Sequence, residues 1–214
     1  LLCIALIFLY VKSRSNDPMP FGGMVTLIKI YAIIGIIATG IAILAMTGLT
    51  ISIRLFLDDA LRYFILFAII IAPFILITLL HSIAMLMWSN SIRKGATSVY
   101  LSSRGSILLA VTSILLAVVG IATTIAMAIY INLYSYEISE LLRQLADEYP
   151  SFHYNNAFDG NTAIGSIFLS AATVVMVINS VLSAVFYGLF AALAISYHMY
   201  IKTVSYTHLT LPTN

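Results

Sequence analysis

The chain has 214 residues, of which 62% are apolar and only 8% are charged, and its mean hydropathy is +1.07. A soluble domain contains about 45–50% apolar and about 25% charged residues, so these few charges cannot cover the surface of a water-soluble globule of this size. The composition therefore excludes a soluble enzyme, a nucleic-acid-binding domain and a disordered chain. It indicates a polytopic membrane protein. We expect it to contact the lipid bilayer and not to bind nucleic acid.

Apolar segments follow one another along the chain. The first, residues 1–11, gives about 17 Å of helix against a hydrocarbon core of roughly 30 Å, so we expect a partial N-terminal span. The complete spans are predicted at residues 24–53, 63–88, 106–134 and 163–197. In lipid these segments must be helical, because every backbone N–H and C=O needs an internal partner. The sequence thus predicts an all-α transmembrane helical bundle, four complete spans plus one partial span, in a single membrane domain over 1–202.

The C-terminal residues resemble a translated sequencing adapter. The segment SYTHLTLPT, Ser205–Thr213, matches the translation of TCT-TAT-ACA-CAT-CTG-ACG-CTG-CCG-ACG from a transposon-end adapter, and the bases upstream would encode Val204. This resemblance covers Val204–Thr213 and is highly specific. It implies that residues 203–214 are a non-native tail. Because the chain also opens without Met or a basic leader region, we expect a gene truncated at both ends.

Basic residues alternate between the two sides of the predicted bundle. The side of loops 12–23 and 89–105, counted with Lys29 and with Lys202 after the last span, carries seven basic residues and one acid, whereas the side of loops 54–62 and 135–162 carries three basic residues and seven acids. The positive-inside rule therefore places the first pair of loops in the cytoplasm and the second pair outside a plasma or cytoplasmic membrane. The aromatic residues expected at the interfaces are Trp88, Tyr100, Tyr197 and Tyr200.

The longest connection, 135–162, has a helical pattern of its own. Its apolar side chains on one helical face are Ile138, Leu141, Leu142 and Leu145. Pro150 ends this pattern. Because the flanking apolar segments also run beyond the length that a bilayer requires, we expect the third and fourth complete spans to continue outside as a short helical hairpin.

Small residues recur in the 106–134 span at alternating steps of four and three. They are Ser106, Ala110, Ser113, Ala117, Gly120 and Thr124. Such a stripe lets helix backbones approach closely. It fits an interface with a protein partner or homo-oligomer, or packing within the bundle, which we favour. A shift of 85 residues aligns Ala32, Gly35, Ile36 and Thr39 with Ala117, Gly120, Ile121 and Thr124. This alignment would make each set the start of a two-span unit, in a parallel repeat like those of some transporters.

Few polar residues within the spans could carry chemistry. His81 is the only titratable group well inside a span, but no span supplies a carboxylate for a proton relay, so we expect a neutral histidine bonded within the bundle. Near the middle of the last span, Asn179, Ser180 and Ser183 are candidates for intramembrane polar contacts with another helix or a substrate. Pro73 is a possible hinge, because proline frees the carbonyl four residues earlier.

The sequence contains no motif for catalysis, cofactor binding or metal binding. It lacks a Gly-x-Ser-x-Gly elbow and a phosphate-binding loop, and its one cysteine, Cys3, excludes an intramolecular disulfide and a Cys-based metal cluster. We therefore expect no cofactor and predict a membrane-embedded subunit, permease-like or scaffold, of a larger transport or secretion assembly. The alternatives are a stand-alone carrier of a neutral or lipidic substrate that uses His81, Asn179 and Pro73, and, less favoured, a membrane enzyme.

Overall fold

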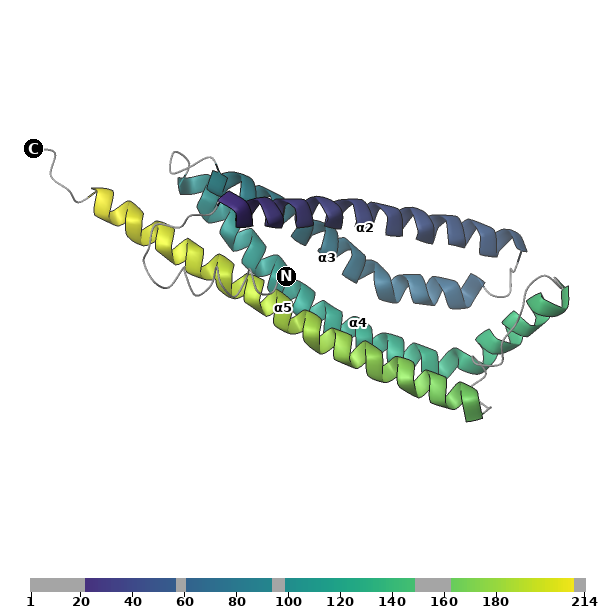
Figure 1. Cartoon of the computed structure of the whole chain (residues 1–214). Helices are drawn as coiled ribbons and strands as arrows, with labels where there is room; N and C mark the ends of the chain where they lie inside the picture. Colours follow the sequence, from purple (N-terminus) through teal and green to yellow (C-terminus); the bar gives the residue numbers. More distant parts are fainter. Residues whose placement is uncertain (1–21, 57–60, 94–98, 149–162, 210–214) are drawn as a thin grey trace, which may run out of the picture. The chain divides into compact units, whose positions relative to one another are not determined.

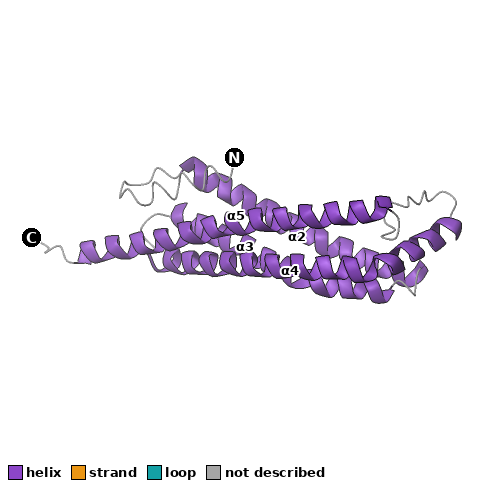
Figure 2. Ribbon diagram, turned by 90° about the horizontal axis from the view of Figure 1, so that it is seen from below, coloured by secondary structure: helices purple, strands orange, loops and turns teal. Residues whose placement is uncertain are grey.

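The computed structural model describes residues 22–56, 61–93, 99–148 and 163–209, and all of them are α-helical (Figure 1, Figure 2). The helices are α2 (Gly22–Phe56), α3 (Leu61–Arg93), α4 (Val99–Glu148) and α5 (Ala163–Leu209). Each contains a stretch long and apolar enough to cross a membrane. The predicted all-α membrane fold with four complete spans is thereby confirmed for this part of the chain. The partial span at 1–11 lies outside the described residues.

The helices extend beyond the apolar segments that predicted them. α4 continues past its membrane-spanning part, Arg104–Glu137, as one uninterrupted helix to Glu148, two residues before Pro150. A helix commonly ends there, because proline disfavours the helical conformation of the residue before it. The connection 149–162 is outside the described residues, so the outer hairpin stays a prediction. α5 extends to Leu209, through much of the adapter-like segment.

All four helices contribute to each of two compact units. Unit 1 consists of Leu1–Ile41, Ile75–Val118 and Ser183–Asn214, and unit 2 consists of Ala42–Phe74 and Val119–Leu182. On α3 the division follows Phe74, directly after Pro73, which lies inside this helix.

Unit 1 has a core of aromatic and small side chains. Its buried members are Ile28, Ala32, Ala84, Met85, Trp88, Leu109, Ala110, Phe190, Leu193, Ala194 and Tyr197. Trp88 is only 1% exposed and meets the Tyr197 ring edge to face, with centroids 5.6 Å apart. Both residues were expected in an interfacial belt, which stays a prediction; their rings fill the space between helices, where small neighbours leave room for them. The side chains of Tyr100 and Tyr200 are outside the described set.

Close backbone contacts explain part of the small-residue stripe on α4. A Cβ atom on Gly105 would lie 3.3 Å from the Trp88 Cα, so α3 and α4 approach closely there. Ser106, Ala110 and Ser113 are buried within unit 1. Packing within the chain therefore occupies this half of the stripe, whereas Ala117, Gly120 and Thr124 are half-buried.

Each of the two aligned glycines, Gly35 and Gly120, accepts the same kind of local hydrogen bond from a threonine four residues later in its own helix. Thr39 Oγ1 donates to the Gly35 carbonyl at 2.7 Å, and Thr124 Oγ1 donates to the Gly120 carbonyl at 2.9 Å. Such bonds to the carbonyl one turn earlier are common for threonine in helices, so they do not establish a repeat. The two-span repeat stays a prediction.

Unit 2 is held by a cluster of tyrosines at the start of α3. Tyr63 and Tyr130 are both buried, and the Tyr130 hydroxyl donates to the Tyr63 carbonyl at 2.9 Å. Tyr134 packs on both rings, with centroids 5.4 Å from Tyr63 and 5.3 Å from Tyr130. Arg62 Nη2 donates to the Tyr63 hydroxyl at 2.6 Å, and its guanidinium lies 4.6 Å from the centre of that ring.

The outward faces of the helices are apolar. Leu44 and Leu55 are more than 70% exposed, and Leu133 and Leu182 are each 64% exposed. In water such large apolar side chains would be buried, whereas in a bilayer they face lipid tails that are as apolar as they are. The chain is an integral membrane protein that contacts the lipid bilayer.

Candidate functional site within the spans

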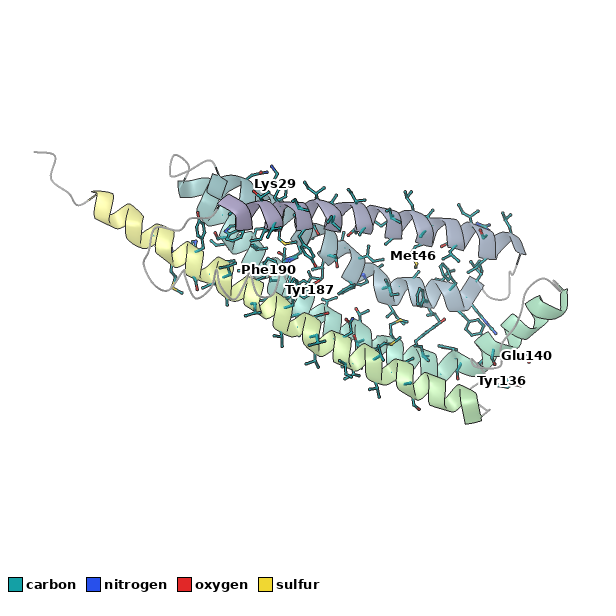
Figure 3. All side chains as sticks on the ribbon, viewed as in Figure 1. Lys29, Met46, Tyr136, Glu140, Tyr187 and Phe190 are labelled. Carbon is teal, nitrogen blue, oxygen red and sulfur yellow. The ribbon has the colours of Figure 1, made fainter. Side chains whose placement is uncertain are left out.

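The imidazole of His81 is enclosed by three helices of unit 1. α3 carries His81, which is 2% exposed, and α4 supplies Thr112 and Ser113, whose hydroxyl oxygens lie 3.3 Å and 3.4 Å from Nδ1. α5 supplies Tyr187 and Phe190, both labelled in Figure 3, whose rings meet the imidazole edge to face at centroid distances of 5.3 Å and 5.5 Å. His81 thus joins three helices at one point.

The hydroxyl groups on α4 determine which nitrogen of His81 carries the proton. Thr112 Oγ1 donates to the Leu108 carbonyl at 2.9 Å, and Ser113 Oγ donates to the Leu109 carbonyl at 2.7 Å. A hydroxyl has one hydrogen, so each of these oxygens has only lone pairs left for His81. We therefore infer that the imidazole is the donor and that its proton is on Nδ1, shared between the two oxygens. At these lengths both bonds are weak.

The second nitrogen of His81 has no hydrogen-bond partner among the described residues. Nε2 is buried, and so are two other unpartnered polar atoms, Trp88 Nε1 in unit 1 and Glu137 Oε2 in unit 2. With the proton on Nδ1, Nε2 is a bare acceptor whose surroundings are the aromatic rings of α5. The neutral histidine that the sequence predicts stays a prediction.

The contact between Ser113 and His81 joins two spans, and sequence reasoning missed it. Within the predicted span 63–88 the one serine is Ser82, which is adjacent to His81 in the sequence. A hint was available, because His81 is the one histidine within the predicted spans and Ser113 belongs to the small-residue stripe of another span. The geometry is not that of an activated nucleophile, since the Ser113 hydroxyl donates to Leu109 and is fully buried.

The polar residues of α5 are not brought to His81. Asn179 and Ser180 belong to unit 2, whereas His81 and Ser183 belong to unit 1. The two serines are half-buried, but the Asn179 side chain is exposed, and it makes no hydrogen bond to the described part of the chain. Asn179 lies within the apolar stretch Ser170–Met199, about 8 Å along the helix from its middle.

Metal binding finds no support in the described residues. Among them, no group of three or more histidine, cysteine, aspartate or glutamate side chains could hold a metal ion. Pro73, the candidate hinge, is exposed on α3.

Comparisons of this chain with protein-family models, with curated proteins and with solved structures found no match.

Proposed function

We propose that this protein is a membrane-embedded, permease-like or scaffold subunit of a larger transport or secretion assembly. The observation that carries the proposal is the exposed amide of Asn179, which lies inside a membrane-spanning stretch. Hydrocarbon offers no hydrogen bond, so an unpartnered amide there is costly. A polar group from another membrane helix would remove that cost, and amide side chains stabilise helix contacts in this way.

The surroundings of His81 also favour an assembly subunit over a self-contained carrier. A carrier needs polar groups that line a substrate path, but His81 is enclosed by Thr112, Ser113 and two aromatic rings. This arrangement gives the imidazole a role in joining helices. Another polar group inside the spans, Asn179, is exposed at a position where a neighbouring subunit could contact it.

The test uses membranes that contain the full-length chain, solubilised in mild detergent and separated on native gels. We expect the chain to migrate in a species larger than one 23.4 kDa copy with its bound detergent. Asn179→Leu should reduce the large species and increase the share that migrates at the monomer position. Val181→Leu, at an exposed apolar position on the same helix, is the matched control and should leave the large species intact. A monomer for the unaltered chain would overturn the proposal.

A further inference from the structure

We propose that Asn179 lies on a homodimer interface and that its partner in the membrane is a second copy of this chain, bound through the same face of α5. The inference rests on the proposed function and names the neighbour that the assembly would supply. It is argued from three properties of this face, namely its exposure, its depth in the membrane and the chemistry of the amide.

The face is a short strip that we call the Asn179 strip, formed by Val175, Asn179 and Leu182. Steps of four and three residues place these side chains on one side of a helix. Val175 and Leu182 are each 64% exposed, and Asn179 is exposed between them. The strip therefore offers a neighbouring helix one exposed polar side chain between two exposed apolar ones, spaced as at the a and d positions of a helix seam.

The depth of the amide favours an identical partner. Two copies inserted in the same orientation and related by a twofold axis along the membrane normal place their Asn179 residues at the same depth. Any other partner would need a polar side chain of its own at that level. A second copy has one by identity.

The chemistry of the amide completes the complementarity. A carboxamide has an acceptor oxygen and donor N–H groups, so two asparagines facing each other across a twofold axis can each donate to the other. The pair satisfies both amides within hydrocarbon, where lipid cannot. One polar residue at the centre of an apolar seam also fixes the register and the number of helices.

The experiment measures contact between copies directly. Cys3 is replaced by serine, and a single cysteine is introduced at Leu182 on the strip or, as the matched control, at Val177. Val177 is 50% exposed but lies about 160° away around the helix from Asn179. Two differently tagged copies are co-expressed, their membranes are oxidised, and disulfide-linked dimers that carry both tags are quantified.

We expect dimers with the cysteine at 182 and few with the cysteine at 177. Asn179→Leu should weaken self-association about 3- to 30-fold, the size of one interhelical hydrogen bond, and dimer yield should fall accordingly. Asn179→Gln keeps an amide and should retain most of the yield. Equal yields at 177 and 182 that do not respond to Asn179→Leu indicate random collision and would overturn the inference.

The remaining outcomes separate the inference from the proposed function. One outcome is that no self-linked dimers form, while the large native-gel species is present and is reduced by Asn179→Leu. This outcome would mean that the amide contacts a different chain. That result overturns the homodimer and leaves the assembly. Absence of both dimers and a large species would overturn the two proposals together.

Discussion

The hydroxyl of Tyr130 on α4 donates a hydrogen bond to the main-chain carbonyl of Tyr63 on α3, across 2.9 Å, and both residues are buried. This bond joins two spans that are 67 residues apart in sequence. Tyr130→Phe removes the hydroxyl and keeps the ring, so the carbonyl loses its side-chain partner while the packing persists. We expect the free energy of unfolding in mixed micelles to fall by about 0.6–2 kcal/mol.

Tyr134→Phe is the matched control for this change. Its ring belongs to the same cluster, but the structure shows no hydrogen bond from its hydroxyl to a described residue. Its stability should stay within about 0.5 kcal/mol of the unaltered protein. Equal losses for the two variants would show that the Tyr130 bond does not hold α3 to α4.

The protonation of His81 can be observed directly. Because Thr112 and Ser113 each donate to a backbone carbonyl, the imidazole proton should be on Nδ1. ¹⁵N spectra of the histidine-labelled protein in lipid should show a directly bonded hydrogen on Nδ1 and none on Nε2. His81→Gln identifies the signal by its disappearance. A proton found on Nε2 would contradict the donor assignment.

The two hydroxyls that share this proton should be energetically coupled. Either Thr112→Val or Ser113→Ala leaves His81 one acceptor, because the other oxygen remains within 3.4 Å of Nδ1. We expect each single change to cost less than about 1 kcal/mol, and the double change to cost about 0.5–2 kcal/mol more than their sum. Unfolding of all three variants in one detergent mixture measures this. Strict additivity would show that the proton is not shared.

Substitution of Gly35 tests the contact between α2 and α3. A Cβ atom there would collide with Ser82 Oγ, which is buried and donates to the Thr78 carbonyl at 2.9 Å. Overpacking of this kind costs about 1–3 kcal/mol, so Gly35→Ala should lower the unfolding midpoint.

Gly40 on the same helix has nothing within 4 Å of the equivalent position, so Gly40→Ala should be neutral or slightly stabilising. Adding Ser82→Ala to Gly35→Ala removes the colliding oxygen and should recover part of the loss. If Gly35→Ala were as mild as Gly40→Ala, the close approach of α2 and α3 would be refuted.

The sidedness predicted from the basic residues is tested with reporter fusions. An alkaline phosphatase domain inserted in loop 54–62 should be active, because this loop is predicted to lie outside, and one in loop 89–105 should be inactive. A fluorescent protein that matures only in the cytoplasm should give the opposite result at each position. The reverse pattern would invert the proposed topology.

The positions of the spans could be predicted from sequence because hydrocarbon requires long apolar helices. The segment 63–88 lies within α3, Leu61–Arg93, and 106–134 lies within α4, Val99–Glu148. Ends marked by hydropathy alone were predicted less well, since hydropathy falls where the membrane stops and α5 continues to Leu209, beyond the apolar limit at 197. On α4 the helical pattern before Pro150 had indicated the extension, and the helix is described to Glu148.

The sequence did not predict which side of each helix packs against its neighbours. A spanning helix is apolar all round, so Leu109, which is fully buried, and Leu44, which is 74% exposed, have the same appearance. Polar residues are more informative, and the sequence singled out His81 as a candidate for a bond within the bundle. Its partners could not be named, because Thr112 and Ser113 belong to a different span.

The two compact units impose an order on the making of this protein. Each unit takes a piece of all four described helices, including part of α5, so no single cut in a loop would release a complete unit. A ribosome that has finished α4 has therefore delivered neither unit in full. Before α5 is inserted, α2, α3 and α4 lack part of their packing partners. Trp88 has no contact with Tyr197, and His81 has none with Tyr187 and Phe190, until α5 is in the membrane. Biogenesis of both units is thus completed by the same helix.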